Sequence, residues 1–142
     1  MRFSSQQEGQ VSWKFSNVLI ESEKRTLLEV HGYAEAALSH CTLTGSNVDG
    51  EVNRCTDAIL IRSLQQSRSV QVADGDAVGP RVTVHSSALR HSEQALRFLV
   101  PTGRPNCTAH LTNCLVENNT KAFVMAFSSK VFFSCTGATV HP

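Results

Sequence analysis

The stretch Leu111-Thr112-Asn113-Cys114-Leu115-Val116 decides the fold. It carries apolar side chains or cysteine at its first, fourth and sixth positions, and this spacing recurs with first members at residues 15, 38, 61, 84, 111 and 132. Three successive steps are 23 residues long, and the last two are 27 and 21. A nearly fixed period in this range is typical of stacked repeats. The copies are Phe15-Val18-Ile20, Leu38-Cys41-Leu43, Ile61-Leu64-Gln66, Val84-Ser87-Leu89, Leu111-Cys114-Val116 and Phe132-Cys135-Gly137.

The spacing within each copy indicates two short strands joined by a bend. Side chains alternate between the two faces of a strand, so the fourth and sixth positions share one face. The third position, where the chain would bend, always holds a small polar residue or His: Asn17, His40, Ser63, Ser86, Asn113 and Ser134. Asn in particular tolerates the left-handed backbone of a tight bend.

A single copy is too short to bury its own apolar residues, so the copies must stack. We therefore predict an all-β fold, a single-stranded parallel β-helix or solenoid of about six coils with a repeat of about 23 residues. This domain would span residues 11–137, after a disordered segment or N-terminal cap at 1–10 and before a tail at 138–142. The alternative is an α+β domain with amphipathic helices at Thr26–Cys41 and Ser87–Val100. Gly32 and poor helical spacing, respectively, argue against these helices.

Three segments, "FSNVLI" (15–20), "LSHCTL" (38–43) and "LTNCLVENN" (111–119), resemble rungs of the pectin-lyase-like right-handed parallel β-helices. The resemblance covers about residues 11–137, nearly the whole chain, and rests on periodicity rather than on a catalytic signature. It implies three strands per coil and a ladder of polar residues at the tight bend, here Asn17, His40 and Asn113. A left-handed hexapeptide β-helix fits less well, because its short motif repeats are not visible.

The resemblance also implies a groove along one sheet, with charged side chains that point outward. If strands near residues 28–30, 52–54, 70–72, 96–98 and 123–125 form that sheet, its outward polar side chains are ligand-binding candidates. These candidates are Glu29, His31, Asn53, Gln71 and Arg97. They include no pair of carboxylates at the separation that glycosidases use. The Arg-x-Pro-x-x-Arg motif of pectate lyases is absent, so no catalytic residue is assigned and no cofactor is expected.

Two carboxylates lie close together in Asp74-Gly75-Asp76, which makes Asp74 and Asp76 candidate calcium ligands. An acidic triplet that contains Gly is more often a plain turn. Five cysteines are present, and the repeat places Cys41, Cys114 and Cys135 in one inward column as buried thiols.

Charge and hydropathy exclude two classes of partner. The chain has 13 basic and 12 acidic residues without a basic run, which does not favour nucleic acid. No apolar run is long enough for a membrane span, and residues 1–8 lack the apolar core of a signal peptide. The sequence does not indicate in which cellular compartment the protein resides.

We therefore expect a non-catalytic binding or scaffold module that contacts a polysaccharide or a protein through an outward sheet face. Two alternatives remain: a polysaccharide lyase or glycoside hydrolase, or a fragment of one, acting in a groove, and a viral or intracellular module for protein–protein contact. The short polar ends provide no evident cap, so we also expect the β-helix either to continue or to pair end to end with another copy.

Overall fold

The computed structural model describes residues 1–5, 11–23, 25–32, 34–48, 51–62, 78–99, 106–126 and 131–141. All of their regular structure is β-strand, which confirms the predicted all-β class. The alternative with two helices is wrong, because Thr26–Cys41 and Ser87–Val100 contain strands instead. These described residues include no helix that is long and apolar enough to cross a membrane.

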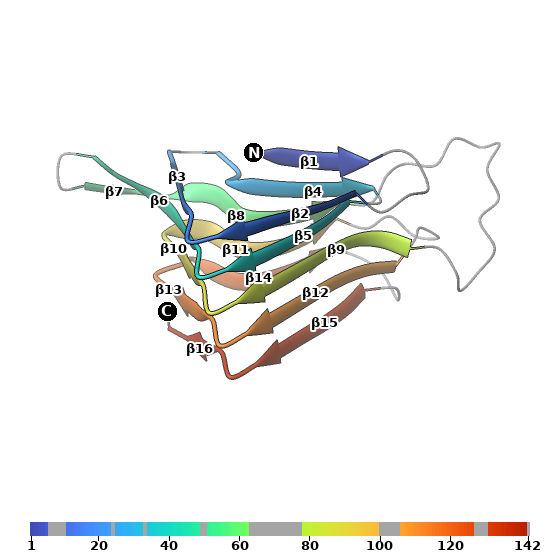
Figure 1. Cartoon of the computed structure of the whole chain (residues 1–142). Coiled ribbons are helices and arrows are strands. Elements are labelled where there is room, and N and C mark those ends of the chain that lie inside the picture. The colour runs from blue at the N-terminus through green and yellow to red at the C-terminus, as the bar shows by residue number, and fades with distance from the viewer. Residues whose placement is uncertain are drawn as a thin grey trace.

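Fifteen of the sixteen strands form three parallel sheets, named A, B and C below (Figure 1). Sheet A contains β1 (Arg2–Ser5), β4 (Leu28–Gly32), β8 (Cys55–Arg62), β11 (Ser92–Leu99) and β14 (Lys121–Ala126). Sheet B contains β2 (Val11–Ser16), β5 (Ala34–Ser39), β9 (Val78–His85), β12 (Asn106–Thr112) and β15 (Val131–Thr136). Sheet C contains β3 (Leu19–Ser22), β6 (Thr42–Val48), β10 (Ala88–Arg90), β13 (Leu115–Glu117) and β16 (Thr139–Val140), and β7 (Glu51–Asn53) pairs antiparallel with β6.

The chain visits the sheets in the fixed order A, B, C, and repeats this circuit five times. Each strand therefore pairs with the strand one circuit earlier and the strand one circuit later, and the N- and C-termini lie toward opposite ends of the stack (Figure 1). Strands also occupy parts of the two terminal segments: Arg2–Ser5 is β1, and Thr139–Val140 is β16.

A left-handed residue lies at each bend from sheet B to sheet C. These residues are Asn17, His40, Ser86, Asn113 and Gly137, with φ between 48° and 63°. The bend N–H of one circuit donates to a carbonyl of the next circuit, as from Asn17 to Ser39 at 3.1 Å. Glycine suits position 137, because its φ is +63° and an added Cβ would lie 2.4 Å from Asn113 Oδ1, so the Asn113 side chain would have to move. Backbone hydrogen bonds thus link all five bends.

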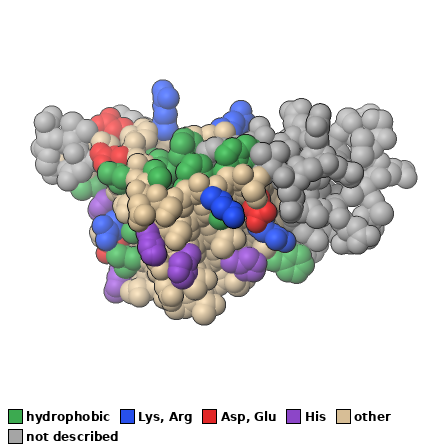
Figure 2. Space-filling model, in the orientation of Figure 1, with side chains coloured by type: hydrophobic (Ala, Val, Ile, Leu, Met, Phe, Trp, Pro, Cys, Tyr) green, Lys and Arg blue, Asp and Glu red, His purple; other side chains and the backbone are tan. Residues whose placement is uncertain are grey.

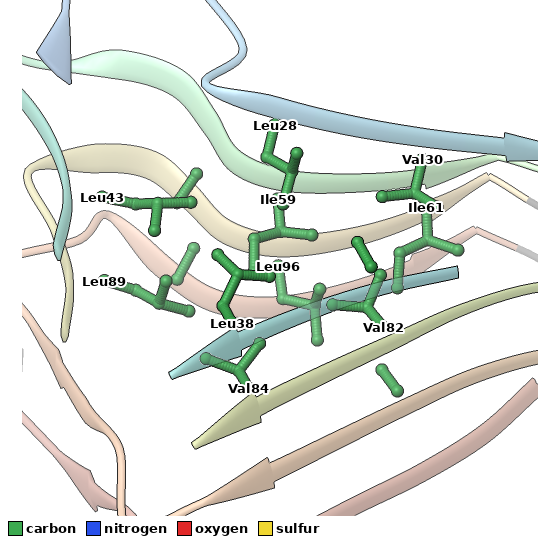
Figure 3. Packing of buried hydrophobic residues seen from close by; sticks show 14 of the residues in the cluster. Leu28, Val30, Leu38, Leu43, Ile59, Ile61, Val82, Val84, Leu89 and Leu96 are labelled. Carbon is green, nitrogen blue, oxygen red and sulfur yellow. The ribbon is translucent and has the colours of Figure 1, made fainter. Parts of the chain in front are cut away.

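The inward side chains of the three sheets meet in one apolar core (Figure 3). Leu28 and Val30 approach from sheet A, Leu38 and Val84 from sheet B, and Leu43 from sheet C (Figure 3). In β5, buried and half-buried residues alternate, as expected for a strand with one face in a core.

The strand pairing shows that two residues predicted for the apolar column, Ile61 and Phe132, lie outside it. Leu38 pairs directly with Val84, whereas Ile61 lies in sheet A beside Val30 and Phe98. At the last circuit Leu111 pairs with Cys135, and Phe132 is 58% exposed on the outward face. Ile61 therefore belongs to β8 of sheet A, and Leu64 and Gln66 of that predicted copy lie outside the described residues. Each sheet has five strands on its path rather than six.

We expect Leu111→Ala to lower the free energy of unfolding by about 2–5 kcal/mol, because Leu111 is fully buried in the core. Phe132→Ala is the matched control and should change it by no more than about 0.5 kcal/mol, as surface substitutions usually do. Urea denaturation followed by Trp13 fluorescence measures both. A larger loss for Phe132→Ala than for Leu111→Ala would contradict this register.

Candidate functional site

Sheet A brings three of the predicted ligand-binding residues onto one outward face. Glu29 and His31 lie on β4, and Arg97 lies on β11. The register places Leu60 of β8 between Glu29 and Arg97, and Leu60 is only 5% exposed. Three predicted side chains therefore lie on this face, but Leu60 separates Glu29 from Arg97.

These side chains already have partners within the chain. Glu29 Oε1 lies 2.6 Å from His31 Nε2, and its Oε2 lies 3.6 Å from Arg2 Nε. Arg97 Nη2 lies 2.8 Å from Oδ2 of Asp57, which also accepts a hydrogen bond from Thr26 Oγ1 at 3.0 Å. Asp57 is fully buried, and its second oxygen, Oδ1, has no hydrogen-bond partner. Arg97 thus supplies the positive charge that the buried Asp57 carboxylate needs as a partner.

The remaining predicted residues do not join this face. Asn53 lies on β7, outside sheet A, and donates to Glu23 Oε1 at 3.4 Å. Its assignment was wrong because the strand of sheet A begins two residues later, at Cys55. Gln71, Asp74 and Asp76 lie outside the described residues. Within the described ranges, no group of three His, Cys, Asp or Glu side chains could hold a metal ion.

The proposed ladder residues Asn17, His40 and Asn113 all occupy the left-handed bend. Asn17 and His40 are on neighbouring circuits, but Ser86 lies between His40 and Asn113. The continuous ladder is formed by backbone N–H and C=O groups, and a ladder between these three side chains stays a prediction.

Sheet B carries a different surface, rich in hydroxyl groups. Its outward positions follow from the pairing register and alternate with the buried columns. Figure 2, with sheet B toward the viewer, shows histidines and a few charged side chains on a mainly uncharged surface. By strand, the outward residues are Ser12, Lys14 and Ser16; Glu35, Ala37 and Ser39; Arg81, Thr83 and His85; Thr108, His110 and Thr112; and Phe132, Ser134 and Thr136.

A shallow hollow of about 320 Å³ lies on this face over β2, β5 and β9. In its middle row the small Ala37 is flanked by Lys14 and Thr83, so missing side-chain volume creates the depression. The side chains of Ser16, Ser39 and His85 form the next row. Lys14, Ser16, Ser39, Thr83 and His85 line the hollow together with Phe15, Ala37 and Leu38, and most of its exposed lining is apolar. No carboxylate is among these residues.

Neighbouring groups hold part of this surface in place. The His85 ring lies 6.1 Å from the ring of His40, which contacts Ser39 Oγ through Nδ1 at 3.5 Å. Ser12 Oγ donates to Glu35 Oε2 at 3.2 Å, one row from the hollow. The arrangement can donate and accept hydrogen bonds over a flat area, which suits a ligand rich in hydroxyl groups.

The cysteines supply no reactive centre in this surface. All five are free, four of them are buried, and Cys135 is exposed. Cys41 and Cys114 share an inward column in which Ser87 separates them, whereas Cys135 lies in the neighbouring column beside Leu111. The prediction of a buried Cys135 in the same column is therefore wrong, because the last bend lies at Gly137. Burial raises the pKa of the Cys55 thiol to about 11 and that of Cys107 to about 12.

We expect a thiol reagent at neutral pH to label Cys135 rapidly in the native state and the other cysteines slowly, because burial and raised pKa values suppress the thiolate at Cys55 and Cys107. Mass spectrometry after a timed pulse measures the modified positions. Cys135→Ser should abolish the rapid phase, and urea should make all remaining thiols reactive. Rapid native labelling of Cys55 or Cys107 would contradict the buried assignment.

We expect Arg97→Met to destabilise the fold by about 3–5 kcal/mol, because it leaves the fully buried Asp57 without its cation. Arg90→Met is the matched control. Arg90 pairs with Glu117 at 2.6 Å in a half-exposed position, so its loss should cost about 0–1 kcal/mol. Urea unfolding of both variants makes the comparison, and equal losses would contradict a stabilising role specific to the Asp57–Arg97 pair.

The chain was compared with protein-family models, curated proteins and solved structures. None of the three comparisons finds a match. The outward faces of sheets A and B are therefore the features from which a function can be inferred.

Proposed function

We propose that the chain is a non-catalytic binding module on a parallel β-helix, and that the outward face of sheet B binds a polysaccharide. The observation that carries the proposal is the hollow between Lys14, Ala37 and Thr83, whose mainly apolar lining is bordered by Ser16, Ser39 and His85. A sugar polymer offers the matching array of hydroxyl donors and acceptors, and the small Ala37 leaves room for a ring.

The β-helix part of the proposal is supported by the path of the chain. Five circuits through sheets A, B and C, parallel pairing within each sheet and a left-handed residue at each bend are what stacked coils require. The five circuits through sheets A, B and C support a β-helix of five coils. Three strands per coil and a polar bend residue are also the features that the resemblance to the pectin-lyase-like family implies.

The regular spacing of sheet B favours a linear polymer as ligand. Neighbouring strands are about 4.8 Å apart, so a chain that crosses the strands meets an outward residue of the same row at each step. One such row contains Lys14, Ala37, Thr83, His110 and Ser134. A repeating ligand could make similar contacts along the row.

Binding without catalysis is supported by the state of the charged side chains. On sheet A, Glu29 pairs with Arg2 and contacts His31 Nε2, and Arg97 pairs with Asp57. Hydrolysis of a glycosidic bond commonly needs two carboxyl groups on either side of that bond. The residues that line the hollow include none.

A glycan array followed by calorimetric titration of the best ligand tests the proposal. Thr83→Arg should fill the hollow and weaken binding at least about tenfold, equivalent to ~1.4 kcal/mol. Thr42→Arg is the matched control, because Thr42 faces outward on sheet C beside Leu19 and Ala88, and it should leave the affinity unchanged.

Absence of any glycan binding, or equal losses in the two variants, would overturn the proposal. Incubation of each array ligand with the protein, followed by chromatography of the products, separates binding from cleavage. Shortened products would favour the alternative, a polysaccharide-degrading enzyme.

A further inference from the structure

We infer that this chain binds a second copy of itself end to end, with the edge formed by β14, β15 and β16 of one copy on the edge formed by β1, β2 and β3 of the next. The inference rests on strand pairing and not on the proposed glycan ligand. Each edge presents one strand from each of the three sheets. The two edges therefore offer the same set of sheets in the same order.

The direction of the strands selects the arrangement. All pairings between circuits are parallel, so each sheet continues across the junction only if unlike ends meet. Like ends would bring the strands together in antiparallel directions and would break the common order of the sheets. Contact between unlike ends is heterologous and does not close on itself, so it leads to open chains rather than to a symmetric dimer.

The backbone hydrogen bonds between successive bends leave a donor on the last edge and an acceptor on the first edge. In each circuit the bend N–H donates to the carbonyl that precedes the next bend. The series runs Asn17 to Ser39, His40 to His85, Ser86 to Thr112 and Asn113 to Thr136, at 2.9–3.1 Å. The next step would take the Gly137 N–H to the Ser16 carbonyl of the second copy.

A second series runs in the opposite direction and is also complementary at the ends. Its bonds run from Thr42 to Val18, Ala88 to Cys41, Leu115 to Ser87 and Thr139 to Cys114, at 2.9–3.0 Å. The next step would take the Leu19 N–H of the second copy to the Ala138 carbonyl. The two edges are thus complementary at two further hydrogen bonds, the chemistry by which an added strand extends a sheet.

The apolar core is open at the β15 and β16 end. Phe133, Cys135 and Val140 occupy inward positions there, paired with Ala109, Leu111 and Val116. The three partners are fully buried, but Phe133 is 36% exposed and Val140 is 47% exposed.

The opposite edge supplies the missing contacts. Trp13, Phe15 and Ile20 hold the same inward positions at the other end, where they are only half-buried. In register, Trp13 of the second copy would cover Phe133, Phe15 would cover Cys135, and Ile20 would cover Val140. Continuing the columns in this way buries apolar surface on both copies.

The outward rows bring no like charges together at the junction. Among the described side chains, continuing the register places Lys14 of the second copy beside Ser134, and Glu21 beside His141. The row that contains Glu21 and His141 already holds the Arg90–Glu117 ion pair at 2.6 Å. A second copy therefore fits the edge in backbone, core and charge.

Sedimentation velocity and timed thiol labelling over a dilution series test the inference on the full chain. As the concentration rises, we expect a progressive series of larger species and a parallel slowing of Cys135 labelling, because Phe15 of the next copy covers that thiol. A wild-type chain that stays monomeric, with labelling independent of concentration, would overturn the inference. So would a single dimer that grows no further, or association that leaves Cys135 equally reactive.

Two matched variants locate the contact. Val140→Lys should abolish association, because a charge tolerated at the open end would be buried without a partner at the junction. Ala88→Lys is the control, since Ala88 faces outward on β10, the middle strand of sheet C. Leu19→Pro removes the backbone donor on the other edge and should also weaken association. Assembly that persists in both edge variants would overturn the inference.

Discussion

The left-handed bend between sheets B and C is the constraint on which the other features of the structure depend. Parallel strands cannot be joined by a short hairpin, so each chain segment must travel through the other two sheets before it returns beside itself. The bend directs it onto that path within a single residue. A non-glycine residue in this conformation carries a local energetic cost. Asn17, His40, Ser86 and Asn113 tolerate it because the hydrogen bonds of adjacent circuits fix each bend.

Once the bends are aligned, the two faces of every strand are determined. The inward columns, such as Phe15, Leu38, Val84 and Leu111, build the core. The outward rows of sheet B are free to carry hydroxyl and imidazole groups at a regular spacing. Sheet A uses its outward face differently, because Arg97 there pairs with Asp57, and Glu29 pairs with Arg2 and contacts His31. The same backbone rule therefore produces one face that stabilises the fold and another that is available to a ligand.

The sequence predicts the all-β class, four of the five bends and much of the core, because the spacing within a copy is set by strand geometry. The spacing cannot show that Leu38 and Val84 are direct neighbours in sheet B, and this explains why Ile61, which lies between them in the sequence, was assigned to their column although it belongs to sheet A. The last copy is ambiguous because Phe132-Cys135-Gly137 and Cys135-Ala138-Val140 have the same spacing. The preference of Gly137 for a left-handed backbone was the signal that could have decided between them.

For the candidate sites too, the sequence predicts what depends on neighbouring residues but not what depends on residues far apart in the chain. Strand alternation correctly placed Glu29, His31 and Arg97 on one face, but it could not reveal that they pair within the chain. Asp57 was missed because its partner Arg97 is 40 residues away in sequence. The sequence did not single out the polar face of sheet B, because its hydroxyl groups lack the charge that marks a catalytic site. Its local signal was present in the alternation Thr108-x-His110-x-Thr112.

The proposed polymer site on sheet B and the proposed end-to-end contact share one direction, along which the strands stack. A ligand that crosses the strands runs along the stacking direction, toward the two edges where the sheets remain unpaired. In an end-to-end pair, the row that contains Thr83, His110 and Ser134 would continue with Lys14 of the second copy. A polymer bound across that junction would contact both copies, and each contact would raise the effective concentration for the other. Reciprocity then requires that a long ligand strengthens the junction by the same free energy by which the junction strengthens ligand binding, whereas a short oligosaccharide confined to the hollow leaves the junction unaffected.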